Sequence, residues 1–357
     1  EPIERTLSIR TLDGNGDPFP YNGDLKVTVR PGRLASDQDP WISVEDGEIV
    51  SGDETVRFQA AFGPTRIWLS DEGDKDQTSE RKPTFATGVS EVLEFEFPTI
   101  AEFNKTTDSN GDPYIQNTTN HLVSEFTEVN LANRDVIATV VSTNGFWVTD
   151  IDSYNNSEDG GYSSLYVYTF SKPTGIVVGS RVTKLTGGNQ EYLGSTQLSF
   201  PEYEVDENLA LELVPEPKSL TGAQVCNTTN RDYDNHRMES FESALVKIDS
   251  ATIAFDGNAD EIEDYLEYGQ WPVTFTDGNT SCVMYVDSSA LSYAFDPIEL
   301  DGTDVGPITG VLNQIWSKWI IILTDDNGIS SEFAAESVPR RPRGPSRPMA
   351  RFPEGQR

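Results

Sequence analysis

The short acidic motif Asp-x-Asn-x-Asp occurs three times in the chain, at residues 13–17, 108–112 and 256–260. Side-chain oxygens at positions 1, 3 and 5 of a tight turn are the ligands with which a loop wraps a hard cation such as Ca²⁺. The repetition predicts calcium-stabilised turns and a protein that works outside the cell, where calcium is plentiful. Adaptation of the surface to a saline habitat is the alternative interpretation of the same acidity.

The third copy has the most complete ligand set. Its spacing matches the ligand positions of an EF-hand loop, with a backbone carbonyl at position 7. The expected ligands are Asp256, Asn258, Asp260, Ile262, Asp264 and Glu267. Position 6 is Glu261 instead of glycine, and no helix pair is expected around it. The sequence therefore predicts a calcium-clamped loop between two strands, with a solvated acidic loop as the alternative.

The other two copies offer fewer ligands. The expected ligands of the first copy are Asp13, Asn15, Asp17 and, at position 12, Asp24. The expected ligands of the second copy are Asp108, Asn110 and Asp112. The second copy has Thr119 at position 12 and so lacks the bidentate acid that completes a calcium loop. A β-turn rich in Asp and Asn is the alternative for the first.

The composition is strongly acidic, with 59 acidic and 26 basic side chains and a formal net charge of −33. Such a surface repels phosphates, so no broad nucleic-acid interface is expected. Because carboxylates occur throughout the chain, a pair of them does not diagnose a hydrolase. The sequence contains neither a nucleophile elbow nor a phosphate-binding glycine loop. We therefore expect a protein that is not an enzyme.

The chain has two cysteines, Cys226 and Cys282. In a chain that is otherwise free of thiols they predict one disulfide and an oxidising, extracellular location. Two separate buried thiols are the alternative.

No apolar run approaches the ~20 residues of a membrane-spanning helix, so no transmembrane segment is expected. The longest run, Trp319 to Leu323, has the length of a strand. We expect Glu1 to be a processed end from which a signal sequence or a lipid anchor has been removed.

The hydrophobic pattern predicts an all-β chain of several domains. Residues 1–100 alternate like the short strands of an immunoglobulin-like β-sandwich, and the polar residues 101–130 suggest a linker. Residues 131–215 and 216–335 then repeat a series of five strands, a count that suits two OB-fold-like barrels, the second containing the disulfide. Residues 336–357 form a basic tail rich in proline and arginine.

The strand series of the first barrel resembles a known group of domains. The segments Gly-Phe-Trp-Val-Thr-Asp at 145–150, Leu-Tyr-Val-Tyr at 165–168 and Gln-Leu-Ser-Phe-Pro at 197–201 are similar to OB-fold domains of secreted bacterial proteins. Such domains occur beside extracellular nucleases and in uncharacterised surface lipoproteins of myxobacteria and their relatives. The resemblance covers about two-thirds of the chain and implies a bacterial cell-surface location. It transfers no catalytic residue.

Four aromatic residues of this barrel suggest a binding surface. OB barrels bind oligonucleotides or sugars on an exposed face with aromatic side chains. Phe146, Trp147, Tyr166 and Tyr168 could form such a platform. The alternative is that strand alternation divides them between the barrel core and the opposite surface.

The tail reverses the charge of the rest of the chain. Residues 338–357 carry six arginines, five prolines and a single acid. The arginines expected to contact a partner are Arg340, Arg341, Arg343, Arg347 and Arg351. We expect this extended segment to dock on acidic protein surface of its own or a neighbouring chain. The sequence thus predicts a calcium-stabilised surface or assembly protein; the alternative is a polysaccharide- or nucleic-acid-binding OB module, accessory to a secreted hydrolase.

Overall fold

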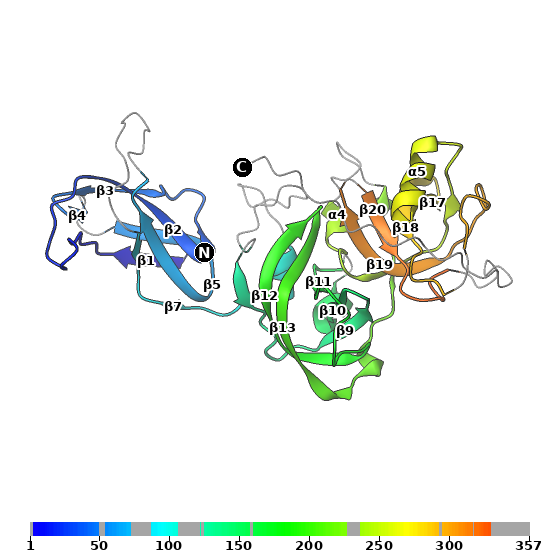
Figure 1. The fold of residues 1–357 in the computed structure, drawn as a ribbon, viewed down its shortest axis with the longest axis horizontal. Coiled ribbons are helices and arrows are strands. Elements are labelled where there is room, and N and C mark those ends of the chain that lie inside the picture. Colours follow the sequence, from blue (N-terminus) through cyan, green and yellow to red (C-terminus); the bar gives the residue numbers. More distant parts are fainter. Residues whose placement is uncertain are drawn as a thin grey trace. The chain divides into compact units, whose positions relative to one another are not determined.

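The computed structural model describes residues 3–49, 54–72, 87–105, 122, 125–157, 160–226, 236–292, 295–316 and 318–329 (Figure 1). The described residues are mostly β, with 48% in strands and 11% in helices, as the hydrophobic pattern predicts. The chain divides into two compact units. Unit 1 comprises Glu1–Glu216, Asn227–Leu245 and Leu312–Trp319, and unit 2 comprises Pro217–Cys226, Val246–Val311 and Ile320–Arg357.

The first sheet has seven strands. They are β1 (Ile3–Leu7), β2 (Gly23–Leu34), β3 (Trp41–Glu45), β4 (Glu48–Ile49), β5 (Glu54–Ser70), β6 (Gly88–Val89) and β7 (Leu93–Glu94). The order is β1-β5-β2-β3-β4, and β6 and β7 pair with β5. Alternate residues such as Val27, Val29, Val56 and Phe58 are buried on one side, as strand periodicity requires. The immunoglobulin-type arrangement stays a prediction.

The second sheet closes into a five-stranded barrel. Its strands are β9 (Val136–Val141), β10 (Gly145–Asp150), β11 (Ser164–Tyr168), β12 (Ser180–Tyr192) and β13 (Ser195–Leu209). The order around the barrel is β9-β10-β11-β13-β12, and β12 pairs with β9 to close it. All neighbours are antiparallel except β11 and β13, which run parallel. The long strands β12 and β13 are the green arrows of Figure 1.

Short elements complete the barrel. A small strand β8 (Phe126–Glu128) adds to β12, and α2 (Ile151–Asn156) follows β10. Before them, α1 (Ile100–Asn104) begins with a capping box between Thr99 and Glu102. Phe103 and Leu122 are fully buried in the barrel core. The described parts of the predicted linker therefore contribute to this core.

The third sheet repeats the same connectivity. Its strands are β14 (Lys218–Ser219), β15 (Leu245–Ile248), β16 (Thr252–Ile253), β17 (Gln270–Asp277), β18 (Thr280–Asp287), β19 (Ile308–Ile315) and β20 (Lys318–Ile322). Their order is β14-β15-β19-β20-β18-β17-β16. The five strands β15, β17, β18, β19 and β20 correspond in order to β9–β13 of the barrel, and, as there, the third and fifth of them, β18 and β20, are parallel. The elements η1 (Leu211–Leu213), α3 (Gly222–Val225), α4 (His236–Glu239) and α5 (Ala259–Tyr268) lie between strands in sequence.

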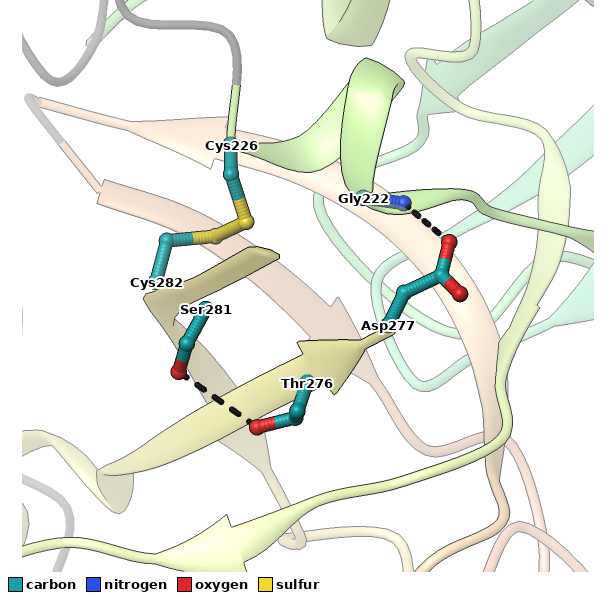
Figure 2. The surroundings of a disulfide bond; sticks show 6 residues. All are labelled: Gly222, Cys226, Thr276, Asp277, Ser281 and Cys282. Carbon is teal, nitrogen blue, oxygen red and sulfur yellow. Dashed lines mark hydrogen bonds between the residues drawn. A yellow bond between two sulfur atoms is a disulfide. The ribbon is translucent and has the colours of Figure 1, made fainter. Parts of the chain in front are cut away.

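The predicted disulfide is confirmed. Cys226 at the end of α3 is bonded to Cys282 on β18, with a Cα–Cα distance of 5.5 Å (Figure 2). Beside it, the backbone N–H of Gly222 donates to the carboxylate of Asp277 at 2.8 Å. The bond therefore ties a short helix to the β17–β18 hairpin within unit 2.

The loop expected at the third acidic motif is a helix. Asn258 is the N-cap of α5, and its side chain accepts a hydrogen bond from the backbone N–H of Asp260. Gly269 ends the helix in the left-handed conformation (φ +80°), which glycine adopts without strain. Residues from Ala259 onward therefore follow helical spacing and do not wrap around a central point. The helix forms because a good N-cap, strong helix formers and a C-terminal glycine act together.

No helix in the described ranges is long and apolar enough to cross a membrane.

Candidate ligand-binding face of the barrel

Strand alternation sorts the four predicted aromatic residues onto two faces. Phe146 points into the barrel core, where its ring meets Tyr203 edge-on at 4.9 Å. Trp147, Tyr166 and Tyr168 occupy the alternate positions of β10 and β11 and lie on the outer face. The four residues are therefore divided between the core and the outer face, as the alternation alternative has it, and a binding platform of the three outer residues stays a prediction.

Five aromatic rings form a continuous row on this outer face, which we call the aromatic strip. Its members are Trp147, Tyr166, Tyr168, Phe170 and Phe200. Successive ring centroids are separated by 4.4, 6.3, 4.4 and 4.8 Å. The strip begins at Trp147, which is only 5% exposed, and ends at Phe170 and Phe200, which are 53% and 67% exposed. It is thus anchored at one end and open to solvent at the other.

The two most exposed rings are held by unusual backbone. Phe170 and Phe200 have φ values of +62° and +52°, in the left-handed region that bulky residues rarely adopt. Gly188 pairs with Ser199 and Thr186 with Glu202, so one residue of β12 faces two of β13 at this point. Phe200 therefore lies in a β-bulge, a device that re-aims a side chain. Strained positions that display aromatic rings to solvent point to a functional role.

Uncharged polar side chains border the strip. The strand register places Gln197 beside Tyr166 and Ser199 beside Tyr168. The hydroxyl of Ser199 donates to Oε1 of Gln190 at 2.7 Å, and Nε2 of Gln197 donates to the Ser199 hydroxyl at 3.1 Å. These groups can both donate and accept hydrogen bonds without carrying charge. Gln197 and Ser199 are buried, at 8% and 1% exposed, so they support the strip, and Gln190 is the exposed neutral group beside it.

Tyr166 is locked in the centre of the row. Its hydroxyl donates to Oδ1 of Asn144 at 3.1 Å, and its ring stacks on Trp147. Burial raises the pKa of Tyr166 to about 12, so its hydroxyl is a neutral donor at physiological pH. A Cβ added to Gly145 would lie 2.6 Å from the Tyr166 ring and 2.5 Å from the carbonyl oxygen of Val167. The absence of a side chain at Gly145 makes room for the ring.

Gly145→Ala should therefore displace Tyr166 and destabilise the barrel by about 1–3 kcal/mol, because the clash includes backbone. Urea unfolding measures the loss. Gly14→Ala is the matched control, since nothing lies within 4 Å of an added Cβ there. Equal stability of the two variants would contradict this packing role.

The predicted metal ligands of the first motif form an Asx-type turn. Oδ1 of Asp13 accepts backbone N–H groups of Asn15 at 2.8 Å and Asp17 at 2.9 Å, and these bonds lower the pKa of Asp13. Asp24 lies on β2, where Oδ1 accepts from the Ser43 hydroxyl at 2.7 Å. The Asp13 carboxylate thus already stabilises the turn itself. Calcium binding here stays a prediction.

The other predicted site residues are distributed as follows. Asp260, Ile262, Asp264 and Glu267 lie on α5, Asn258 caps it, and Asp256 precedes it. Asp108, Asn110 and Asp112 of the second motif lie outside the described residues, as do Arg340, Arg341, Arg343, Arg347 and Arg351. Within the described ranges, no group of three or more His, Cys, Asp or Glu side chains is arranged to hold a metal ion.

No protein-family model, curated protein or solved structure matches the chain. The geometry of the barrel face is therefore the basis for any functional proposal.

Proposed function

We propose that the protein is a non-enzymatic binding module that takes a neutral polysaccharide on the aromatic strip of the barrel. The observation that supports this proposal most directly is the exposed pair Phe170 and Phe200, displayed by left-handed backbone at the end of a stacked row.

We infer that the barrel is of OB type. Counting β9 as the first strand, neighbours follow the order 1-2-3-5-4-1, with a parallel pair between strands 3 and 5. OB barrels bind oligosaccharides and oligonucleotides on the face of strands 2 and 3. Those strands are β10 and β11, which carry Trp147, Tyr166 and Tyr168. The strip therefore occupies the face where an OB barrel binds its ligand.

The chemistry of the face favours sugar over nucleic acid. The apolar C–H face of a pyranose ring packs on aromatic rings, while its hydroxyls need neutral donors and acceptors such as the exposed amide of Gln190. Nucleobases also stack on aromatic rings, but their phosphates need basic side chains. The net charge of −33 opposes that interaction. A chain of linked neutral sugars fits both properties of the face.

The double substitution Phe170→Ala/Phe200→Ala tests the proposal. Each exposed ring is expected to contribute about 1 kcal/mol, so the pair should weaken binding roughly 30-fold. Affinity electrophoresis in gels containing a neutral β-glucan, a xylan or a galactan measures the effect. Tyr268→Ala is the matched control, because Tyr268 is an exposed aromatic residue on α5.

Two outcomes would contradict the proposal. The first is that the wild-type chain keeps its full electrophoretic mobility in gels containing each polysaccharide. The second is that the double variant binds as tightly as the wild type. For comparison, binding of a single-stranded oligonucleotide is measured over a series of salt concentrations. Tight, strongly salt-dependent oligonucleotide binding would favour nucleic acid as the ligand instead.

The disulfide supports an oxidising and therefore extracellular or cell-surface location, which is part of the proposal. The assembly role predicted for residues 338–357 stays a prediction, because these residues lie outside the described ranges.

A further inference from the structure

Three glutamates from two distant segments gather in the interior of unit 1. Glu191 comes from the end of β12, Glu239 from α4 and Glu242 from the turn that follows α4. Glu239 and Glu242 are each only 2% exposed. Thr196 joins two of the acids, because its hydroxyl donates to Oε2 of Glu191 and its backbone N–H donates to Oε2 of Glu242, both at 3.0 Å. We call these three residues the acid cluster.

The acid cluster has more buried acceptors than donors. One carboxylate oxygen of each glutamate is buried without a hydrogen-bond partner. Gln314, which is fully buried, donates its backbone N–H to Glu242, yet its own side-chain oxygen also lacks a partner. That oxygen lies against Gly194, beside the Ser195–Thr196 segment that holds Glu242. An unpartnered amide oxygen at this place requires a donor, and ionised carboxylates supply none.

The surroundings supply no compensating positive charge among the described residues. The ionisable groups that act on the cluster from β12, α4 and the turn after α4 are its own three members. The groups contributed by β13 and β19 are the neutral side chains of Ser195 and Thr196 and the backbone of Gln314. Arg237 of α4 is exposed. A fully ionised cluster would therefore bury three negative charges together, which is very costly.

Protonation of the acid cluster both supplies the missing hydrogen-bond donors and removes buried negative charge. A protonated carboxyl is neutral, and its O–H can donate to a neighbouring carboxylate or to an amide oxygen. Burial raises the pKa of all three glutamates, and repulsion by the other acids raises the pKa of Glu239 and Glu242 further. The arrangement is the one in which carboxyl groups share protons and titrate together.

We propose that residues 236–244 form a proton-controlled latch, closed on the barrel while the acid cluster shares protons and released when the cluster ionises. Besides the cluster, buried side chains and backbone hydrogen bonds hold the segment. Met238, Ser243 and Ala244 are at most 1% exposed, and the N–H of Leu312 donates to the carbonyl of Ala244 at 3.0 Å. The N–H of Tyr162 donates to the carbonyl of Ser240 at 3.0 Å, and the N–H of Ser243 donates to the carbonyl of Leu312 at 2.8 Å. Phe241 is buried and lies close to Gly160.

Amide hydrogen exchange of the intact chain tests the latch. After correction for the intrinsic pH dependence of exchange, amides of residues 236–244 should exchange at least about tenfold faster at pH 8.5 than at pH 5.5, the change that one pKa unit produces. The variant Glu239→Gln/Glu242→Gln cannot ionise at these positions and should keep its protection at pH 8.5. Glu191→Gln provides a second variant on the barrel side, in case the double variant does not fold.

Three results would overturn the proposal. The first is equal corrected protection of the wild type at both pH values. The second is a loss of protection with pH that is as large in a folded Gln variant as in the wild type. The third is that adding 1 mM CaCl₂ at pH 8.5 fully restores protection in the wild type but not in the Gln variants. That result would mean that the cluster binds a cation and not protons. None of these measurements depends on polysaccharide binding.

Discussion

Replacing both cysteines, as Cys226→Ser/Cys282→Ser, should lower the free energy of unfolding of unit 2 by about 4 kcal/mol, in the chain-entropy model of a disulfide. The bond closes a loop between residues separated by 56 positions, and opening it returns that conformational freedom to the unfolded chain. The folded contacts around it, such as the Gly222–Asp277 hydrogen bond, remain available. The effect is large because total stabilities are only about 5–15 kcal/mol.

Urea unfolding followed by tryptophan fluorescence measures this loss, since Trp271 is fully buried in unit 2. Wild-type protein unfolded in the presence of a thiol reductant is the matched control, and it should unfold at the urea concentration of the double variant. A difference below about 1 kcal/mol between oxidised wild type and the variant would show that the bond does not restrain the unfolded chain as this model requires.

The stability of unit 1 should fall as the pH rises from about 4.5 to about 7. The folded chain holds the pKa of Glu191 at about 7, above its ordinary value of 4.5. In this window the folded state binds more protons than the unfolded state, so raising the pH favours unfolding. Above pH 7 this contribution of Glu191 is constant, because its carboxyl is ionised in both states. The shift corresponds to at most about 3 kcal/mol, and Glu239 and Glu242 act in the same direction.

Calorimetry at pH 5 and pH 8 measures this effect. A loss of about 3 kcal/mol would lower the melting temperature by roughly 6–12 °C in a unit of this size. Glu191→Gln should reduce the pH dependence, and Glu202→Gln is the control, because Glu202 is exposed and pairs with Lys184 on the surface. The control matters because general repulsion in a chain of charge −33 also weakens the fold as pH rises. Identical pH profiles of the wild type and Glu191→Gln would refute the assignment.

The helix α5 shows why the loop predicted at the third motif does not form, while calcium binding there stays a prediction. The spacing of Asp256, Asn258 and Asp260 fits a calcium loop, and the same stretch also carries a complete set of helix signals. Asn258 is a strong N-cap and Gly269 a strong C-terminal stop. The spacing of side-chain oxygens shows which atoms are available as calcium ligands. Helix propensity and capping decide whether the backbone brings those oxygens together around one ion. The capping signals at Asn258 and Gly269 predict the helix.

The aromatic strip was predictable only in part. Alternation along β10 and β11 places Trp147, Tyr166 and Tyr168 on one face from the sequence alone. Phe170 and Phe200 could not be assigned this way. Phe170 follows the end of β11, and Phe200 lies in a bulge that breaks the period-two rule. Their contact at 4.8 Å depends on the parallel pairing of β11 with β13, which no local pattern encodes.

By itself, the sequence determined the mostly β character, the identity of the disulfide partners and the acidic surface, because these follow from composition, short-range periodicity and the presence of just two thiols. The tertiary structure decided the closure of the barrel, the display of the two exposed phenylalanines and the meeting of Glu191 with Glu239 and Glu242. The physical reason is that these features depend on pairings between segments far apart in the chain. The free energy of such contacts comes from burial and hydrogen bonding in the assembled core, which local propensities do not contain.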